Sequence, residues 1–411
     1  MRKCRICGNT KFGLALNMGM APLVNSLLSK EDTREKDKTY PLVVVRCAKC
    51  SLVQLKTIVQ SHKIYADQDY LYYTGDMPQQ SQYMRAFDSL VSEILEKHTK
   101  KGDLIVEIGS NDGTVLGKMA RERRILGVDP STNVAIRAIK RGVPTVSAPF
   151  DKNVARNIRQ EFGPAQVIGG ANCLAHIDDI HGVLEGVTML LSDSGVFWVE
   201  CNYWGGMVKN KHYALVYLDH YSYFSLRNWV DLARMHGMEV FDAFITEAQG
   251  EGLSLRLFAS RDTKRKKTER FLKLVDEEKR TKLNTQATAA QYGKECKKEA
   301  KKLYEVISRL KKQGKSIAGY GAAAKGFSIL QLAGITEKHI DYFVDDSPAK
   351  QGKYTPVTHI PVISRKEAQK KLPDYFFITA PNYADVIVEK EKAYKARGGK
   401  FILPSEGVEI V

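Results

Sequence analysis

Apolar and polar positions between residues 80 and 260 alternate in a way that predicts strands separated by helices. Strand-forming runs occur at residues 103–106, 124–129, 143–150, 165–172, 195–201 and 253–259. Residues 192–194 (SDS) predict a turn, and the helical spacing of residues 80–100 predicts an amphipathic helix before the first strand. Strands that alternate with helices are typical of a parallel sheet covered on both faces. The middle of the chain is therefore predicted to be a doubly wound α/β domain.

The pattern changes twice in the second half of the chain. Residues 264–313 are polar, rich in lysine and nearly free of Gly and Pro, and they predict one or two long helices. The apolar stripe of these helices is Phe271, Leu274, Val275, Leu303, Val306, Ile307 and Leu310. Strand patterns return at residues 315–320, 340–346 and 375–379, and they predict a second, C-terminal α/β domain.

Two Cys-x-x-Cys pairs lie near the N-terminus, Cys4 with Cys7 and Cys47 with Cys50. Each pair places two thiolates on one tight turn, and four thiolates form the closed tetrahedral shell of a structural zinc site. Residues 43–46 predict a strand that leads into the second pair. The chain has seven cysteines, an odd number, which favours metal binding in a reducing compartment over a disulfide scaffold. We therefore expect a small domain with a structural Zn²⁺.

Composition sets broader limits. The 411 residues suffice for two or three domains, and the hydrophobic fraction of 43% and charged fraction of 27% are ordinary for globular proteins. The 63 Lys and Arg against 47 Asp and Glu give a net charge of +16, which favours a polyanionic partner such as a nucleotide diphosphate or a nucleic acid. The sequence shows neither a leader nor a long uncharged apolar run, so we expect a cytoplasmic protein without a membrane span.

The first strand leads into residues 107–113 (EIGSNDG), a glycine turn followed by a predicted helix. A strand, a glycine turn and a helix N-terminus form a cradle for a polar or anionic group. The GxxxG spacing differs from the GxGxxG of dinucleotide-binding turns. The turn resembles motif I of the class I S-adenosylmethionine (AdoMet) methyltransferases, whose glycines let the backbone approach the cofactor. The resemblance implies that four residues of the turn bind AdoMet: Glu107, Gly109, Asn111 and Gly113.

Later strand ends follow in the order that such a fold requires. Asp129 ends the second strand, where a carboxylate can bind ribose hydroxyls, and the same carboxylate can cap the next helix. The third strand ends near Ala148 and Phe150, which we expect beside the adenine. The fourth strand ends on Asn172, beside the expected cofactor. These signals together predict an AdoMet-binding domain.

A second strand–turn–helix pattern begins near residue 315 and contains the turn of Tyr320 and Gly321. This turn predicts another nucleotide cradle, and taken alone it also fits a dinucleotide-binding turn. Three lysines, one at the helix start and two on a later loop, suit a diphosphate: Lys325, Lys350 and Lys353.

Two segments between the predicted strands gather phenols, imidazoles and carboxyls. Residues 67–75 form a loop with clustered tyrosines, which more often pack than catalyse. Residues 213–225 contain an acid, an imidazole and several phenols. His176 is predicted to begin a helix at the carboxyl end of the sheet, where ligands bind in doubly wound folds. By spacing alone, His176 and His220 also fit satisfied structural positions.

The order of these motifs resembles that of the sugar C-methyltransferases, which make branched deoxysugars on nucleoside diphosphates. The resemblance spans nearly the whole chain and rests on the zinc knuckles, EIGSNDG, NCLAHID (172–178), DHYSYFSL (219–226) and AGYGAAAKG…VDDSPAKQGKYTPVTHIPV (318–362). It implies a Rossmann-like class I AdoMet methyltransferase domain, flanked by a small zinc-binding domain and a C-terminal Rossmann-like α/β domain that anchors the nucleotide-sugar. We expect these parts at residues 1–66, 67–262 and 314–411, with a helical connector at 263–313.

The same resemblance implies catalytic roles. A histidine that closes a His-Glu-His-like triplet is the base of the family and matches His220, and four further positions match its active site: Tyr217, Asp219, His176 and Tyr72. The sequence departs from the family where Leu218 and Asp219 replace His-Glu and where Thr74-Gly75 replaces a Ser pair. An imidazole suits proton removal at neutral pH because its pKa lies near the working range. We expect His220 to deprotonate C3 beside a C4 ketone, after which the enolate attacks the sulfonium methyl.

Two other functions also fit parts of the sequence. A zinc-ribbon nucleic-acid methyltransferase would use the positive charge, but the lysines cluster on a predicted helix rather than around aromatic residues. A non-catalytic adaptor would bind a nucleotide-sugar or NAD through the C-terminal domain and would have no affinity for AdoMet. The sequence does not indicate an oligomeric state.

Overall fold

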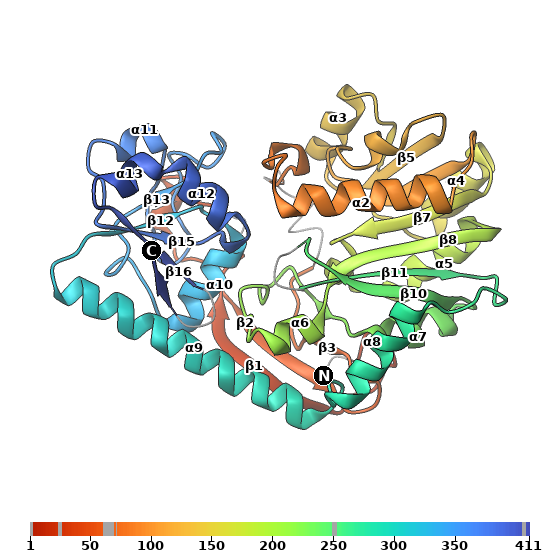
Figure 1. Cartoon of the computed structure of the whole chain (residues 1–411), viewed down its shortest axis with the longest axis horizontal. Coiled ribbons are helices and arrows are strands. Elements are labelled where there is room, and N and C mark those ends of the chain that lie inside the picture. The colour runs from red at the N-terminus through yellow and green to blue at the C-terminus, as the bar shows by residue number, and fades with distance from the viewer. Residues whose placement is uncertain (1–2, 24–26, 61–69, 71, 249–252, 405–407) are drawn as a thin grey trace.

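The computed structural model describes residues 3–23, 27–60, 70, 72–248, 253–404 and 408–411, and its strands form three sheets (Figure 1). We refer to them as the N-terminal, central and C-terminal sheets. Residues 67–69 and 71 of the predicted tyrosine loop lie outside the described residues. Within the described ranges, no helix has both the length and the apolar character needed to cross a membrane.

The central sheet has the strand order β10-β11-β8-β7-β4-β5-β6. Its strands are β4 (Leu104–Ile108), β5 (Arg124–Asp129), β6 (Thr145–Ser147), β7 (Ala165–Ala171), β8 (Leu191–Asn202), β10 (Glu239–Thr246) and β11 (Ser254–Ser260). Strands β8, β7, β4, β5 and β6 are parallel, whereas β11 lies antiparallel between β10 and β8. The doubly wound α/β domain predicted from the apolar pattern is confirmed.

Helices cover both faces of the central sheet. They are α2 (Gln82–Lys97), α3 (Thr132–Lys140), α4 (Lys152–Phe162), α5 (Ile180–Leu190), α6 (Trp204–Lys209) and α7 (Leu226–Met235). Side chains alternate between the faces along each strand. Ile105 and Val167 therefore pack in one apolar cluster with α2, while their neighbours Val106 and Ile168 pack in another with α4 and α5.

The N-terminal sheet is antiparallel and includes a strand from the middle of the chain. Its order is β1-β2-β3-β9, with β1 (Phe12–Ala21), β2 (Tyr40–Cys47), β3 (Val53–Leu55) and β9 (Ser222–Tyr223). Val53 pairs with Tyr223, and Gln54 pairs with Ser222. The N-terminal sheet, and not the central sheet, therefore holds the segment that follows His220.

Residues 264–313 form two helices, α8 (Glu269–Arg280) and α9 (Gln286–Lys312). Helix α9 lies along β1 and continues to the C-terminal sheet (Figure 1). Gly293 makes this contact possible, because a Cβ at this position would lie 1.9 Å from the carbonyl oxygen of Ala15.

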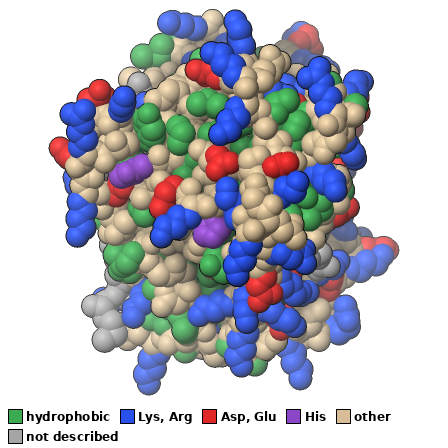
Figure 2. Space-filling view, turned by 90° about the vertical axis from the view of Figure 1, so that its left-hand side faces the viewer, with side chains coloured by type: hydrophobic (Ala, Val, Ile, Leu, Met, Phe, Trp, Pro, Cys, Tyr) green, Lys and Arg blue, Asp and Glu red, His purple; other side chains and the backbone are tan. Residues whose placement is uncertain are grey.

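The C-terminal sheet has the order β14-β13-β12-β15-β16-β17 and is parallel except for β17. Its strands are β12 (Ile317–Tyr320), β13 (Phe343–Val344), β14 (Val362–Ile363), β15 (Tyr375–Ile378), β16 (Lys400–Leu403) and β17 (Glu409–Ile410). Its helices are α10 (Ala324–Ala333), α11 (Arg365–Ala368), α12 (Ala384–Lys390) and α13 (Lys392–Ala396). Figure 2 shows that Lys and Arg are spread over this side of the molecule and interspersed with Asp and Glu.

Three local predictions were wrong. Residues 192–194 continue β8 and do not form a turn. The helix expected directly after Gly113 is a short 3₁₀ helix at Leu116–Met119. His176 does not begin a helix but ends the 3₁₀ helix Leu174–His176, and α5 begins four residues later. Residues 192–194 lie where the pairing of β8 with β7 shifts register, between Leu191 and Val196. In the other two cases local propensity was too weak to decide the conformation.

Candidate active site

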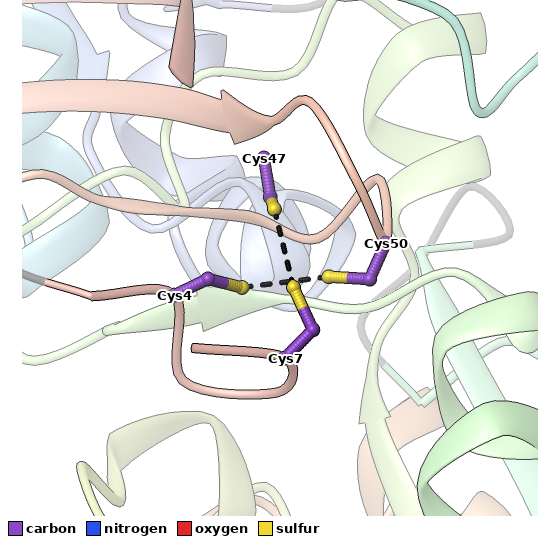
Figure 3. Close-up of side chains that lie close together, drawn as sticks. All are labelled: Cys4, Cys7, Cys47 and Cys50. Carbon is purple, nitrogen blue, oxygen red and sulfur yellow. Dashed lines mark hydrogen bonds between the residues drawn. The ribbon is translucent and has the colours of Figure 1, made fainter. Parts of the chain in front are cut away.

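The four predicted cysteine ligands lie together at the edge of the N-terminal sheet (Figure 3). Their sulfur atoms all lie within 4.8 Å of one another, with 3.4 Å between Cys4 and Cys50 and 3.5 Å between Cys7 and Cys47. A tetrahedral shell with zinc–sulfur bonds of 2.3 Å has sulfur atoms about 3.8 Å apart. The donor set and its spacing therefore fit a closed Zn²⁺ site without an open position.

Arg5 connects this cysteine cluster to both histidine-bearing segments. Its side chain is only 5% exposed, and its Nη1 donates to the carbonyl oxygens of Leu55 and Tyr221, each at 3.2 Å. Its Nε donates to Asp178 Oδ1 at 2.9 Å. Tyr221 follows His220 directly, and Asp178 lies two residues after His176. The first zinc knuckle thus contacts the backbone beside one histidine and the loop beside the other.

A cavity of about 1140 Å³ lies where the carboxyl ends of the central and C-terminal sheets face each other. Its walls include residues at the ends of β4, β5, β7 and β8 on one side and after β12, β13 and β15 on the other. Ligand sites in proteins commonly span about 300–1,000 Å³. The cavity therefore has room for two ligands, one on each sheet.

The predicted motif I turn forms the floor of the central-sheet side. Gly109 has a φ of +66°, and a Cβ there would lie 2.5 Å from Cys173 Cβ, so only glycine fits. Asn111 lines the cavity, and its Oδ1 accepts the N–H of Thr74 at 2.9 Å. Gly113 also has a positive φ, but it packs against Val143 and does not line the cavity.

Two buried carboxyls lie at the ends of β4 and β5. Burial raises the pKa of Glu107 to about 8, with smaller contributions from Asp129 and Asp112. Within the described part of the chain, Glu107 Oε2 has no hydrogen-bond partner. Asp129 accepts the N–H groups of Asn111 at 3.0 Å and Ser131 at 2.9 Å, and burial raises its pKa. Asp129 thus stabilises the turns around the floor and still lines the cavity, so both functions weighed for it are compatible.

The remaining predicted cofactor residues lie on the same side. Asn172, which follows β7 with a φ of +55°, donates from Nδ2 to the hydroxyl of Tyr83 at 3.0 Å. No described residue forms a hydrogen bond with its Oδ1. Phe150 is buried and lines the cavity, whereas Ala148 lies outside its lining. Glu107 and Asn172 therefore each line the cavity and carry a buried acceptor oxygen that the described protein atoms leave unpaired.

His220 is 4% exposed and lines the cavity beside this floor. Its Nδ1 donates to the carbonyl oxygen of Leu215 at 2.6 Å, which leaves Nε2 as the acceptor of the Tyr217 hydroxyl at 2.8 Å. Burial, and secondarily His176, lower the pKa of His220 well below its ordinary value, so the ring is neutral. Burial raises the pKa of Tyr217, which keeps the phenol protonated.

The other predicted catalytic residues surround His220. The rings of His176 and His220 lie 4.7 Å apart, and burial lowers the pKa of His176 to about 4. Asp219 is buried and lines the cavity. Tyr72 is 41% exposed and lines the same space, with its hydroxyl 3.5 Å from that of Tyr83. All five predicted catalytic residues therefore line one cavity, with His176 and Tyr217 against the His220 ring and Tyr72 beside Tyr83.

The C-terminal side is a turn organised by Asp345. The Oδ2 of Asp345 accepts the backbone N–H of Ala322 at 2.8 Å and the Nζ of Lys350 at 3.2 Å. Gly321, with a φ of +95°, allows this turn, and Lys325 lies at the start of α10. Gly321, Lys325 and Lys350 line the cavity, whereas Lys353 does not.

Tyr320 lines the cavity only in part. Its hydroxyl donates to Glu391 Oε1 at 3.0 Å, and Arg365 binds the same carboxylate. The phenol therefore belongs to the packing of the C-terminal domain, while the backbone of the turn borders the cavity.

Sequence reasoning missed two polar residues of the cavity. Tyr83 comes from the first turn of α2 and contacts Asn172, and Asn202 ends β8 beside His220. Neither belongs to a recognisable motif. The only available signal for Asn202 was its place at the carboxyl end of a predicted parallel strand.

Three family models match the chain in succession. Residues 4–65 match a model described as "Putative zinc binding domain", residues 79–243 one described as "Methyltransferase domain", and residues 249–405 one described as "C-methyltransferase C-terminal domain". The C-methyltransferase NovU of Streptomyces niveus is 33% identical over 404 residues, which make up 98% of this chain and 95% of NovU.

Solved structures resemble only part of the chain. A methyltransferase of Clostridium acetobutylicum is 11% identical and covers 45% of this chain and 93% of its own, with a TM-score of 0.36. The magnesium protoporphyrin IX methyltransferase ChlM of Synechocystis, with bound AdoMet, is 13% identical and covers 49% and 89%, with a TM-score of 0.35. The class I methyltransferase fold is shown by the strand order of the central sheet and by the family models.

The predictions of a class I AdoMet methyltransferase fold, of AdoMet and Zn²⁺ as cofactors, and of enzymatic activity are confirmed. A purely non-catalytic adaptor is thereby excluded. NovU is 33% identical over nearly the whole chain, and three family models match the chain in succession. These matches together lead to one assignment. The chain belongs to the family of AdoMet-dependent C-methyltransferases.

Proposed function

We propose that the protein methylates a carbon of a nucleoside-diphosphate keto-deoxysugar, at C3 beside a C4 ketone. The observation that carries this proposal is the single cavity in which a methyltransferase floor, a buried neutral histidine and a second nucleotide-type cradle meet. A carbon acid needs a base and a stabilised oxyanion, and the wall around His220 offers both.

AdoMet would be held by the motif I turn and the strand ends around it: Glu107, Gly109, Asn111, Asp129, Phe150 and Asn172. When bound, it supplies a methyl group that is already electrophilic. The unused acceptors of Glu107 and Asn172 suit the ammonium and hydroxyl donors of such a molecule. On the opposite side, Lys325, Lys350 and the N–H groups after β12 suit the diphosphate of the sugar nucleotide.

His220 acts as the base through Nε2, because its Nδ1 proton is held by the carbonyl oxygen of Leu215. The C3–H bond breaks, its proton moves to Nε2, and its electron pair forms the enolate. In the structure, the Tyr217 hydroxyl donates a hydrogen bond to Nε2 of His220. When the substrate carbon approaches Nε2, this hydroxyl moves aside. Its raised pKa keeps it protonated, so it remains a hydrogen-bond donor. Neutral His176 and Tyr72 are further donors near the developing oxyanion. The enolate carbon would then accept the methyl group that a bound AdoMet supplies.

A His220→Asn variant tests the base. We expect it to bind AdoMet with unchanged affinity, measured by calorimetry, and to lose at least about 10²-fold in turnover. His339→Asn serves as the matched control, because His339 lies outside the cavity lining and bonds only locally to Thr336. Wild-type turnover in His220→Asn would remove this residue from the mechanism.

Solvent exchange tests the position of the reaction independently of methyl transfer. With S-adenosylhomocysteine in place of AdoMet, the C3 hydrogen of the nucleotide-sugar should exchange with deuterium from D₂O, and the exchange should stop in His220→Asn. Exchange at the other carbon beside the ketone would agree with His220 as the base but would contradict C3 as the position of deprotonation. Absence of exchange at both carbons would contradict the substrate class.

A further inference from the structure

Asn202 is a buried polar residue of the cavity that the mechanism above does not use. It is the last residue of β8, is 3% exposed and lines the cavity. Its Oδ1 is itself buried and has no hydrogen-bond partner among the residues that the structure describes. Buried amide oxygens are nearly always hydrogen-bonded, so an unpartnered one on a cavity wall indicates that a ligand supplies the donor.

The side-chain amide of Asn202 lies beside His220 but does not orient its ring. Asn202 Nδ2 is 3.3 Å from Nδ1 and 3.4 Å from Nε2 of His220. Both ring nitrogens already have closer partners, the carbonyl oxygen of Leu215 at 2.6 Å and the hydroxyl of Tyr217 at 2.8 Å. Because Asn202 Nδ2 is almost equally far from the two ring nitrogens, its N–H groups do not point along the lone pair of either nitrogen. The ring is therefore oriented by Leu215 and Tyr217, and the amide is available to another molecule.

The position of the amide determines what it can reach. It is in contact with the ring whose Nε2 takes the substrate proton. It can therefore reach a substituent that is one or two bonds away from the reacting carbon. A neutral amide oxygen complements a neutral donor, whereas an ammonium group would favour a carboxylate. The donor should therefore be neutral and lie close to the reacting carbon. A hydroxyl on the neighbouring sugar carbon meets both conditions.

We propose that Asn202 is a substrate-binding and specificity-determining residue, whose Oδ1 accepts a hydrogen bond from a hydroxyl on the sugar carbon adjacent to the deprotonated carbon. This contact fixes the face of the ring that the base meets. The inference rests on the proposed function and specifies it further, because it states which substituent the enzyme requires.

The test compares two nucleotide-sugars that differ only in this hydroxyl, using the full-length zinc-loaded enzyme. Wild-type kcat/KM should favour the hydroxylated substrate by about tenfold to a hundredfold, because the deoxy analogue leaves the amide unpaired. In Asn202→Leu, which keeps the side-chain volume but has no acceptor, the ratio should fall close to one. AdoMet affinity should stay unchanged in the variant, which verifies that the floor of the cavity is intact.

A conservative variant separates recognition from packing. Asn202→Ser keeps an oxygen acceptor and should retain part of the preference for the hydroxylated substrate, which a purely structural role would not predict. If Asn202→Leu does not fold, the comparison of Asn202→Ser with Asn202→Ala decides the question in the same way. An unchanged preference in the apolar variant overturns the proposal. If the wild-type enzyme neither methylates nor exchanges either sugar, the proposed function fails instead.

Discussion

At the scale of single residues, the environment of His220 decides its protonation state. The titratable groups that face its ring are His176, Tyr217, Tyr223, Asp219 and Lys325. Burial has the largest effect and disfavours the imidazolium, and His176 and Lys325 act in the same direction. The imidazole of His220 therefore stays neutral below the pH at which an ordinary histidine would be protonated, as the proposed base requires.

We expect this lowered pKa to appear in the pH profile. A base acts only when neutral, so a lowered pKa moves the acid limb of kcat/KM to a pH below the ordinary value of 6.5. His176 does not interfere at neutral pH, because its pKa is lowered to about 4. An acid limb centred at or above pH 7 in the free enzyme would contradict the assignment of a desolvated base.

Glu107 should give AdoMet binding a pH dependence of its own. With a pKa of about 8, the carboxyl is protonated at neutral pH in the empty site, and it must release a proton to accept the ammonium group of AdoMet. We expect the AdoMet dissociation constant of the wild type to rise by up to about tenfold per unit below pH 8, relative to that of Glu107→Gln. Titration of AdoMet itself affects both proteins equally. AdoMet dissociation constants that change with pH in the same way in both proteins, measured by calorimetry, would therefore refute the prediction.

The sequence revealed residues that belong to compact motifs but not those that act alone. Glu107 and Gly109 could be identified because a strand, a turn and a helix start follow one another within a few residues. Asn202 and Tyr83 could not, because each is a single polar residue on an otherwise ordinary element. Their proximity to His220 and Asn172 arises only when strands and helices distant in sequence come together.

At the scale of elements, the N-terminal sheet takes part in building the active-site wall. Strand β9 begins two residues after His220 and pairs with β3. Asn228, in the first turn of α7, donates to the carbonyl oxygen of Cys50 at 3.0 Å. Arg5 binds the backbone oxygen of Tyr221, which lies between His220 and this strand. The zinc knuckles therefore position the segment that carries the base.

An Arg5→Met variant tests this positioning role. We expect loss of the hydrogen bonds from Arg5 to Gln54, Leu55, Tyr221 and Asp178 to lower kcat about tenfold to a hundredfold through displacement of His220, while bound zinc and AdoMet affinity remain unchanged. Lys101→Met removes an exposed ion pair, with side-chain exposures of 78% for Lys101 and 64% for Glu122, and should have no effect on turnover. Wild-type kcat in a zinc-loaded Arg5→Met protein would show that Arg5 only stabilises the fold.

The elements that prediction missed are those that depend on distant partners. The long amphipathic patterns of α2 and α9 indicated helices because apolar spacing is a local property. Strand β9 has only two residues, and its pairing with β3 joins segments about 170 residues apart, so no local pattern could indicate it. Residues 192–194 have turn-forming side chains but extend β8.

At the scale of the whole molecule, the central and C-terminal sheets direct the carboxyl ends of their parallel strands toward one cavity. The order of the parts along the chain was predictable, because each part has its own sequence signals. Their relative placement was not, because it depends on α9 packing along β1 and on bonds such as that between Asp37 and His359, at 2.7 Å. The domain limits expected from the sequence stay a prediction, and β9 shows that the N-terminal sheet extends beyond the first limit.

Removal of zinc should affect the molecule beyond the cysteine cluster. A ligand that binds only the folded chain stabilises it by about 3 kcal/mol at a hundredfold excess over its Kd. We expect chelation to lower the thermal midpoint and to reduce turnover, because β9 belongs to the affected sheet, while AdoMet affinity persists in the central sheet. Cys296→Ser, which removes a buried thiol outside the cluster, should retain the metal. Full stability and activity in metal-free protein would contradict this coupling.

The inclusion of β9 in the N-terminal sheet also restricts how such enzymes can be recombined. A chimera that exchanges only the first 60 or so residues between relatives would leave Ser222 and Tyr223 facing a foreign edge strand. Domain shuffling, in the laboratory or in evolution, should therefore succeed when the short strand travels with its distant partner. Sequence changes in β3 and β9 are expected to be inherited as a pair.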